Sequence, residues 1–236
     1  MIYLRLLLVL LWFPIPYGIG FLISPFQWGN TNLNRYAAMA FGKVALRILG
    51  IRLEIEGLDQ LEKHQPCIYV ANHQGALDIL TFGTIYPRHC VVIGKKEIAY
   101  IPVLNLYFVA AGNVLVDRKN RASAVSSLMK AVNAVKKRGA SIWIFPEGTR
   151  NRTEAIMLPL KKGAAHMAIA AQVPIVPVVS SIIKGVNWDY RKLKNGTVRL
   201  KVLPPISTQG LTTADIDRLN ETVRSAMMEA VRGLST

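Results

Sequence analysis

The chain has 236 residues, which is long enough for one α/β domain with a sizeable core plus an appendage. It is both oily and basic: 51% of the residues are hydrophobic, only 18% are charged, and 29 Lys and Arg against 14 Asp and Glu give a net charge of +15. A hydrophobic and basic composition suits a partner that is anionic and hydrophobic, such as a phospholipid surface, a lysophospholipid or an acidic acyl carrier. Nucleic acid is the other common partner of a basic chain, but the sequence holds no nucleic-acid motif and the oily N-terminus argues against it.

The N-terminal segment predicts a membrane association. Residues 6–26 carry no charge, and a straight helix of that length reaches about 31 Å, roughly one bilayer core. Pro14 and Pro16 interrupt the run, so we expect a kinked or re-entrant helix, and both spanning and monotopic arrangements remain open. Arg5 before an apolar run is also typical of a secretory signal peptide, but there is no convincing small-x-small cleavage site.

Residues 31–50 predict an amphipathic helix with a basic stripe of Arg35, Lys43 and Arg47. One alternative is an ordinary helix of the domain. Next to the oily segment, we expect instead that this helix lies on anionic headgroups. If residues 6–26 do span a bilayer, the basic stripe outnumbers Arg5 and keeps the remaining chain in the cytoplasm.

From Arg52 onward, short apolar runs alternate with helical patterns, which is typical of the α/β class. We expect strands at 52–56, 67–71, 90–93, 113–116, 141–145, 175–179 and 197–203, and helices at 76–85, about 125–138, 164–171 and about 213–232. Residues 1–50 are therefore expected to form membrane-anchoring helices, and residues 51–236 one catalytic α/β domain. Cys67 and Cys90 lie in apolar runs and predict reduced core cysteines on the cytoplasmic side.

The stretch around His73 carries the first candidate for chemistry. Pro66 precedes the predicted strand 67–71, the residues that follow it are polar and flexible, and His73 would lie on the loop where α/β sheets place their ligands. Asp78 falls in the first turn of the next helix, from which its carboxylate can bind one imidazole nitrogen and leave the other as a base. The alternative is a histidine at a strand end beside an unrelated Asp, a residue that helix starts favour anyway.

Other strand ends carry cations and one acid. Residues 145–150 (FPEGTR) follow a predicted strand, and Gly148 permits a sharp turn while Thr149 and Arg150 can bind phosphate oxygens, beside Glu147. Arg118 follows another strand, as do Lys95 and Lys96. Carboxyl ends of parallel strands meet at one edge of a sheet, so we expect these groups to converge on His73.

A base beside several cations is suited to deprotonating an alcohol on a phosphorylated molecule. No Ser lies in a Gly-x-Ser-x-Gly elbow, and neither Cys has a base in its own motif. The pattern therefore predicts direct attack of an activated alcohol on an activated acyl group, without an acyl-enzyme. We expect no metal, because the carboxylates and histidines do not cluster at ligand spacing.

Four ordered blocks of the sequence together resemble the motifs of the glycerolipid acyltransferases. They are NHQGALD at 72–78, GNVLVDR at 112–118, FPEGTR at 145–150 and VPIVP at 173–177. The resemblance runs from about residue 50 to residue 205, and Asn151 stands where many members have Ser.

The resemblance implies a mixed, largely parallel sheet flanked by helices, with an N-terminal helical membrane anchor. It implies transfer of a fatty acyl group from acyl-carrier protein or acyl-coenzyme A, used as substrates and not as cofactors, to the sn-2 hydroxyl of lysophosphatidic acid, at the cytoplasmic face of a bacterial inner membrane. His73 corresponds to the family's general base and Asp78 to its orienting partner. The positions that correspond to the family's acceptor-holding motifs are Arg118, Glu147, Gly148, Thr149 and Arg150, and Lys95 or Lys96 matches a further cation.

Three alternatives stay open from the sequence. The acceptor could be another lysolipid, the chain could be a non-catalytic module that binds membrane lipid or an acyl carrier, or the His73–Asp78 pair could activate water in a thioesterase. The intact pair disfavours a binding module, because a binder needs no base.

Overall fold

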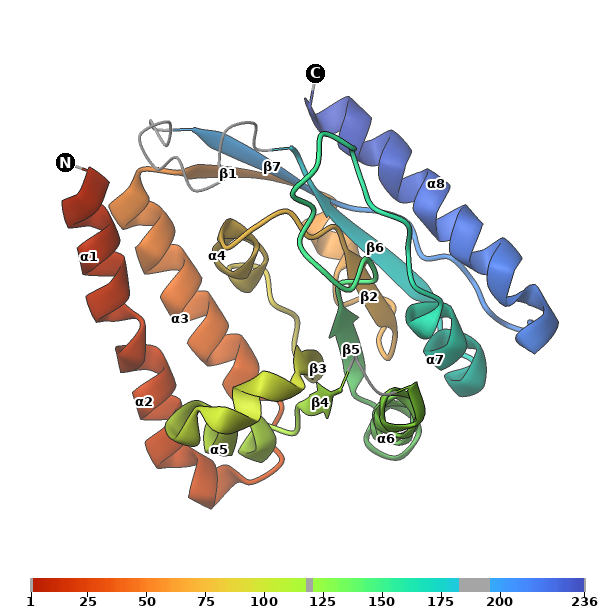
Figure 1. Cartoon of the computed structure of the whole chain (residues 1–236), viewed down its shortest axis with the longest axis horizontal. Coiled ribbons are helices and arrows are strands. Elements are labelled where there is room, and N and C mark those ends of the chain that lie inside the picture. The colour runs from red at the N-terminus through yellow and green to blue at the C-terminus, as the bar shows by residue number, and fades with distance from the viewer. Residues whose placement is uncertain (1, 118–120, 183–195, 236) are drawn as a thin grey trace.

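The sheet that organises this protein is mixed and largely parallel. In the part of the chain that the computed structural model describes (residues 2–117, 121–182 and 196–235), seven strands form one sheet in the order β1-β7-β6-β2-β5-β3-β4 (Figure 1). The strands are β1 (Arg52–Glu56), β2 (Ile68–Ala71), β3 (Cys90–Lys95), β4 (Val114–Val116), β5 (Ser141–Ile144), β6 (Ile175–Ser180) and β7 (Thr197–Val202).

Strands β2 to β6 share one direction, since β2 pairs in parallel with β5 and β6, and β3 pairs in parallel with β4 and β5. Only β7 and its parallel neighbour β1 run the other way, because β6 and β7 are antiparallel. All four residues of the central β2 are fully buried, as expected for a strand covered on both faces. The carboxyl ends of β2, β3, β4, β5 and β6 therefore lie along one edge, and the predicted fold class is confirmed.

Helices cover both faces of this sheet. The helices are α1 (Ile2–Trp12), α2 (Pro14–Ile23), α3 (Asn32–Leu49), α4 (Leu77–Gly83), α5 (Pro102–Ala110), α6 (Arg121–Arg138), α7 (Gly163–Ala171) and α8 (Ile216–Ser235), with the short 3-10 turns η1 (Ser24–Gln27), η2 (Leu58–Gln60), η3 (Lys96–Tyr100) and η5 (Thr213–Asp215). One core lies between the sheet and α6, α7 and α8, and a second lies between the opposite face and α3 and α4.

The N-terminal apolar segment forms α1 and α2, which meet at Phe13 where Pro14 begins a new helix. Residues Ile2–Gln27 form one stretch that is long and apolar enough to cross a membrane, and little of it is buried in the protein. The two helices pack along α3, and the guanidinium of Arg5 donates a hydrogen bond of 3.0 Å to the carbonyl of Leu49. The break that the prolines predict is present, and the segment is attached to the rest of the protein along its length.

The expectation that α3 presents its apolar face to a membrane is wrong. That face, which includes Phe41, Ala45 and Leu46, is buried in the core against α4 and the sheet. The backbone of α4 approaches so closely that a Cβ on Gly42 would lie 2.5 Å from the Leu80 carbonyl oxygen. Helix α3 is thus an ordinary helix of the α/β body, and its exposed side includes Tyr36, Lys43 and Arg47.

Helix α5 has no counterpart among the predicted elements. Its sequence is apolar all round, apart from Asn105, so it gives no periodic signal. Tertiary contacts hold it: the Tyr107 hydroxyl donates a hydrogen bond of 2.8 Å to the Leu33 carbonyl, and the Tyr107 ring lies 5.7 Å from the ring of Tyr17. Helix α5 therefore lies against the N-terminal helices, as Figure 1 shows.

Candidate active site

His73 and Asp78 form a hydrogen-bonded pair at the carboxyl end of β2. His73 lies on the loop between β2 and α4, Asp78 lies in the first turn of α4, and the distance from His73 Nδ1 to Asp78 Oδ2 is 2.7 Å. An ionised carboxylate can only accept, so Nδ1 carries the proton and Nε2 is left with a free lone pair. The imidazole side chain retains 16% exposure, whereas the Asp78 side chain retains 2%. The pair has the geometry of a base and its orienting group.

The carboxylate of Asp78 is held by backbone amides as well as by the imidazole. Its Oδ2 accepts hydrogen bonds from the N–H groups of Gln74 at 2.6 Å and Gly75 at 2.9 Å. These donors replace the water that burial removes. The loop between His73 and Asp78 is thereby wrapped around one oxygen atom, which fixes the distance between the two residues.

Glu147 connects this loop to the end of β5. Its side chain is buried (3% exposed), its Oε1 accepts from the backbone N–H of His73 at 2.6 Å, and its Oε2 accepts from that of Leu158 at 2.9 Å. Burial raises the pKa of Glu147 above its ordinary value, and the two backbone hydrogen bonds oppose that rise. Both oxygens are occupied within the protein, so this carboxylate holds the loops and does not face the solvent.

Two further contacts fix His73 from the same side. The backbone N–H of Asn151 donates a hydrogen bond of 2.7 Å to the carbonyl of His73. The ring of Phe145 stacks on the imidazole with 4.2 Å between the centroids and 21° between the planes. The segment after β5 therefore holds the backbone and one ring face of His73 but leaves Nε2 unused.

Asn72 ties the loop to β6 on the other side of β2. Its side chain is buried and exchanges two hydrogen bonds with the backbone of Ser180: Nδ2 donates to the carbonyl at 3.0 Å, and Oδ1 accepts from the N–H at 2.8 Å. These residues lie 108 positions apart, and sequence reasoning missed the contact. The only hint was an Asn directly after a buried strand, where side chains commonly bind backbone groups.

Gly148 is the position in the 145–150 loop that requires glycine. Its φ is +71°, and a Cβ there would lie 2.8 to 3.0 Å from Cε, Cδ and Nζ of Lys161. The backbone of Lys161 is fixed beside the loop by a hydrogen bond of 2.8 Å from its N–H to the carbonyl of Pro146. Lys161 thus lies across the turn that carries Glu147.

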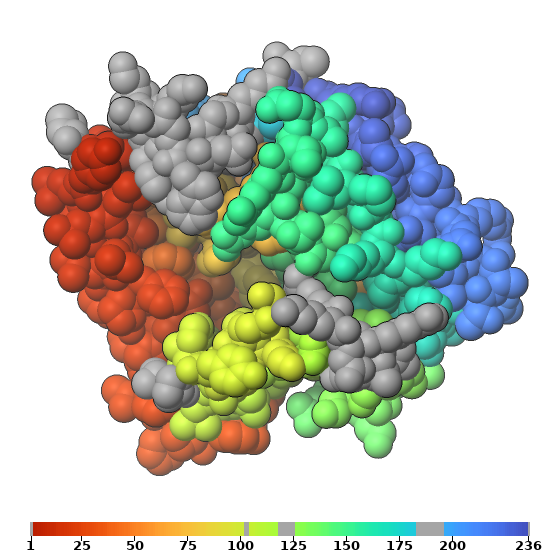
Figure 2. All heavy atoms as spheres, viewed as in Figure 1, coloured from red at the N-terminus to blue at the C-terminus, as the bar shows by residue number. Residues whose placement is uncertain are grey.

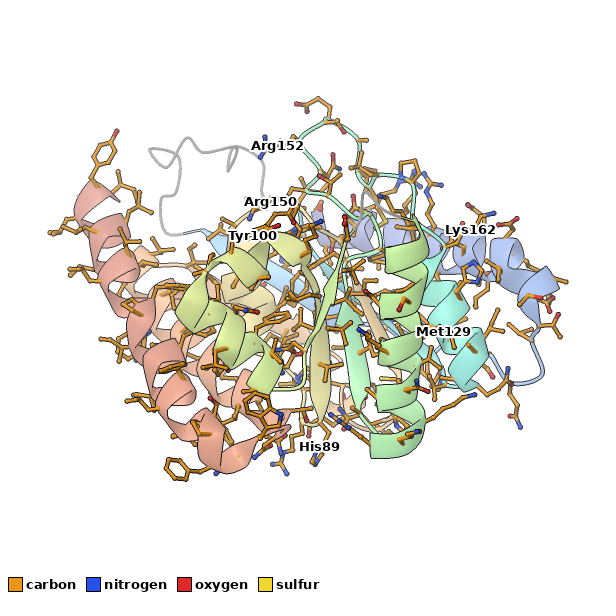
Figure 3. All side chains as sticks on the ribbon, turned by 60° about the horizontal axis from the view of Figure 1, so that its bottom comes forward. His89, Tyr100, Met129, Arg150, Arg152 and Lys162 are labelled. Atoms are coloured by element: carbon orange, nitrogen blue, oxygen red, sulfur yellow. The ribbon has the colours of Figure 1, made fainter. Side chains whose placement is uncertain are left out.

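The remaining predicted residues lie along the same edge but differ in their partners. Thr149 is exposed and Arg150 is half-buried, and among the described residues Arg150 has no ion-pair partner. In Figure 3, Arg150 and Arg152 lie at the end of the molecule opposite His89, which directly precedes β3.

The two lysines at the end of β3, Lys95 within the strand and Lys96 directly after it, are already paired. Lys95 contacts Glu97 at 3.1 Å, and Lys96 contacts Asp117 at 2.7 Å, an interaction that raises the pKa of Lys96. Arg118, the other predicted cation, lies outside the described residues. The structure thus brings His73, Asp78 and Glu147 together by direct contacts, with Gly148 directly after Glu147. It places Lys95 and Lys96 at the end of β3, which neighbours β5 in the sheet.

The surface is hollowed on this side of the molecule. Figure 2 shows the hollow between the N-terminal helices in red, the η3–α5 segment in yellow and the loop after β5 in green, with the golden segment around residue 75 at its floor. Both cysteines lie elsewhere, in the core, where burial raises the pKa of the Cys67 thiol to about 11 and that of Cys90 well above its ordinary value. Such thiols are poor nucleophiles.

Comparison with known proteins identifies relatives of one kind. A family model described as Acyltransferase matches residues 52–181. The 1-acyl-sn-glycerol-3-phosphate acyltransferase of Salmonella typhimurium is 39% identical over 82% of this chain and 78% of its own length, and that of Saccharomyces cerevisiae is 38% identical over 86% and 68%. The match spans about two thirds of the yeast and sheep relatives.

A solved structure shows the same fold. The crystal structure of the 1-acyl-sn-glycerophosphate (LPA) acyltransferase PlsC from Thermotoga maritima superposes with a TM-score of 0.74 at 26% sequence identity, over 99% of this chain and 98% of that one. The similarity therefore includes the N-terminal helices as well as the sheet.

Proposed function

This chain belongs to the acyltransferase family, and from that premise we propose that it transfers a fatty acyl group from acyl-carrier protein or acyl-coenzyme A to the sn-2 hydroxyl of lysophosphatidic acid, giving phosphatidic acid. The single observation that carries the proposal is the 2.7 Å contact between His73 Nδ1 and Asp78 Oδ2, which leaves a base at Nε2. The relatives named above supply the acceptor, and a base with an exposed nitrogen suits the activation of its hydroxyl.

The proposed reaction uses this geometry in two steps. Nε2 of His73 takes the proton of the acceptor hydroxyl while that oxygen forms a bond to the thioester carbonyl carbon. The tetrahedral intermediate then expels the thiolate by breaking the C–S bond, and the imidazolium returns its proton to the sulfur. Asp78 stabilises the imidazolium and holds its orientation. General-base catalysis of this kind contributes roughly 10²–10⁴-fold, and alignment of the two substrates adds more.

We assign acceptor binding to residues near the His73–Asp78 pair whose side chains can donate hydrogen bonds. We assign the phosphate to Arg150, which can bind two oxygens at once, with Thr149 beside it. Lys95 and Lys96 would add positive charge at the end of β3, reduced by their partners Glu97 and Asp117. Glu147 acts through the loop that it holds and is therefore a positioning residue, not a substrate contact.

The N-terminal helices would attach the protein to one leaflet at the cytoplasmic face of the inner membrane. Helices α1 and α2 both pack along α3. If α1 and α2 crossed the bilayer perpendicular to its plane, they would therefore carry α3 into the hydrocarbon with them. Lys43 and Arg47 of α3 are exposed, and charged side chains at the depth of the hydrocarbon are costly. A helix pair lying in the plane of the interface avoids this cost.

The test is an acyl-transfer assay on detergent-solubilised protein with lysophosphatidic acid and labelled acyl-coenzyme A or acyl-carrier protein. The wild type and His64→Ala, a histidine outside the site, should form labelled phosphatidic acid, whereas His73→Ala should not. Full activity of folded His73→Ala would contradict the role of the base. Release of free fatty acid in place of a lipid product would indicate a thioesterase. Activity only on lysolipids without a phosphate monoester would show that the acceptor is one of those lysolipids and not lysophosphatidic acid.

A further inference from the structure

Helix α5 and the turn before it expose an apolar surface that none of the described residues covers. One side of α5 is buried through Tyr107 and Phe108, yet Leu106 and Val109 on the other side are 42% and 43% exposed. Tyr100 and Ile101, directly before the helix, are 73% and 51% exposed. Apolar side chains that gather on a surface in this way are characteristic of contact sites for membranes or proteins.

This surface continues the exposed apolar face of the N-terminal helices. Helix α5 packs against α2 and η1, and the N–H of Gly29 donates a hydrogen bond of 2.7 Å to the carbonyl of Ala110. The packing is close, since a Cβ on Gly20 would lie 2.5 Å from the Tyr107 ring. Figure 1 shows α5 beside α2, and Figure 2 shows the two segments adjoining on one face. The exposed apolar side chains of the N-terminal segment include Leu4, Leu7, Leu10, Leu11, Ile15, Ile19, Leu22 and Phe26.

The residues around this joint surface favour a bilayer over a protein partner. Trp28 and Tyr100 are 63% and 73% exposed, and both combine an apolar ring with a polar group, as is typical of residues at the membrane interface. Arg138 lies beside the end of α5, near the backbone of Gly29 and Gly112, and Lys95 lies before η3 with 59% exposure. Cations at the border of an apolar surface suit anionic headgroups.

We propose that Tyr100, Ile101, Leu106 and Val109 form a second membrane-contact surface, the α5 surface, which inserts into the same leaflet as α1 and α2. The hollow over the His73 loop lies between these two contacts (Figure 2), so a lysolipid can enter it from the leaflet without crossing water. The inference rests on the proposed membrane association of the N-terminal helices, and it does not depend on which acyl transfer the site performs.

The test uses single cysteines labelled with an environment-sensitive fluorophore. Cys67 and Cys90 are both fully buried, so under native conditions an introduced cysteine is the labelling site. Leu106→Cys reports on the α5 surface. Leu10→Cys on α1, 67% exposed, is the positive control, and Met129→Cys on α6, 50% exposed and labelled in Figure 3, is the matched negative control. The labelled full-length proteins are reconstituted with phosphatidylcholine vesicles containing about 30% phosphatidylglycerol.

We expect the labels at residues 106 and 10 to be quenched by spin-labelled acyl chains and shielded from aqueous iodide. The label at residue 129 should be quenched by iodide and not by the spin-labelled acyl chains. A label at 106 that behaves like that at 129 would overturn it, and so would equal quenching at all three sites. Iodide shielding at 106 without lipid quenching would instead identify a second copy of the chain as the occupant. If the label at 10 also stays in water, the membrane association on which the proposal rests is itself refuted.

Vesicle flotation gives an independent measurement. The double substitution of Leu106 and Val109 by Ser should weaken vesicle partitioning by about tenfold or more, because it removes two aliphatic side chains from the contact. Met129→Ser should leave partitioning unchanged. Equal partitioning of the double variant and the wild type would contradict the α5 surface. Neither measurement reads catalysis, so failure of this inference and failure of the proposed acyl transfer are distinguishable.

Discussion

The carboxylate of Glu147 accepts a hydrogen bond of 2.6 Å from the backbone N–H of His73, 74 positions earlier in the chain. The carbonyl of the same histidine accepts a hydrogen bond of 2.7 Å from Asn151, so the loop after β5 holds both polar groups of the His73 backbone. Residues 145–151 therefore hold the backbone of the proposed base and also include Thr149 and Arg150, the residues proposed to bind the acceptor phosphate.

Asp78→Asn should reduce kcat by roughly 10²–10⁴-fold while the protein stays folded. An amide carries no charge to stabilise the imidazolium, and it no longer fixes the proton on Nδ1 of His73. Steady-state kinetics on saturating acceptor measure the effect. Asp217→Asn, which removes an exposed carboxylate on α8, is the control and should retain wild-type kcat. An Asp78→Asn protein as active as this control would exclude an orienting role for Asp78.

Glu147→Gln should lower kcat by roughly 10- to 100-fold with little change in the acceptor KM, because displacement of a catalytic group is costly. Gln offers one acceptor oxygen where Glu147 offers two, so the N–H of either His73 or Leu158 faces an NH₂ group. An unsatisfied buried donor costs about 1–3 kcal/mol. A rise in KM alone would show that Glu147 contacts the acceptor directly. Glu154→Gln, on the exposed part of the same loop, is the matched control.

The raised pKa of Glu147 also predicts how stability depends on pH. Because burial raises its pKa above the ordinary value of 4.5, the folded protein holds this proton more tightly than the unfolded chain does. That contribution to stability is fully present below about pH 4.5 and is lost as the pH rises through the folded pKa. The Tm of the wild type, measured relative to that of Glu147→Gln, should therefore fall as the pH is raised across this range. A Tm difference that is constant or grows with pH would contradict the raised pKa.

Gly148→Ala should lower both stability and activity. At φ of +71° an L-residue costs about 1–2 kcal/mol, and the new Cβ would displace the side chain of Lys161. Gly163→Ala is the control, since its Cβ would meet only Leu128 at ordinary contact distances. Thermal unfolding and the acyl-transfer assay measure the two effects. If Gly148→Ala matched Gly163→Ala in both, the turn would not need glycine.

Arg150→Ala should raise the KM for lysophosphatidic acid by about 10- to 100-fold, the range expected for loss of a hydrogen bond to a charged group. Arg150→Lys should recover only part of this loss, because an ammonium cannot bind two phosphate oxygens in a planar fork. Arg88→Ala, at the opposite end of the sheet, serves as the control. An unchanged KM for Arg150→Ala would assign the phosphate to other residues.

The sequence predicted those parts of the fold and site that depend on local pattern. Strands such as Ile68–Ala71 are apolar runs after a proline, and His73 and Asp78 are close in the chain, so one loop and one helix turn suffice to join them. Residue burial was harder to foresee. The resemblance placed Glu147 among the acceptor-holding residues, and only the fold, which brings His73 and Leu158 to it, shows that its oxygens are occupied.

Elements and contacts that depend on packing between distant residues were not predicted from the sequence. Helix α5 has no polar face and hence no periodicity, and the Asn72–Ser180 contact joins strands far apart in the chain. The amphipathic pattern of α3 was recognised, but a pattern identifies an apolar face without naming what covers it, and here the cover is α4 and the sheet.

The proposed base and the proposed acceptor cation come from different strand ends, His73 from the loop after β2 and Arg150 from the loop after β5. The loop after β5 also holds the backbone of His73, through the side chain of Glu147 and the backbone N–H of Asn151. Exchanging residues 149–152 for those of a relative with another acceptor would redirect selectivity without altering the dyad, provided that Glu147 and Gly148 stay in place. On the proposed assignment, side chains of this loop could be exchanged to alter substrate choice as long as the backbone hydrogen bond from residue 151 to His73 is kept.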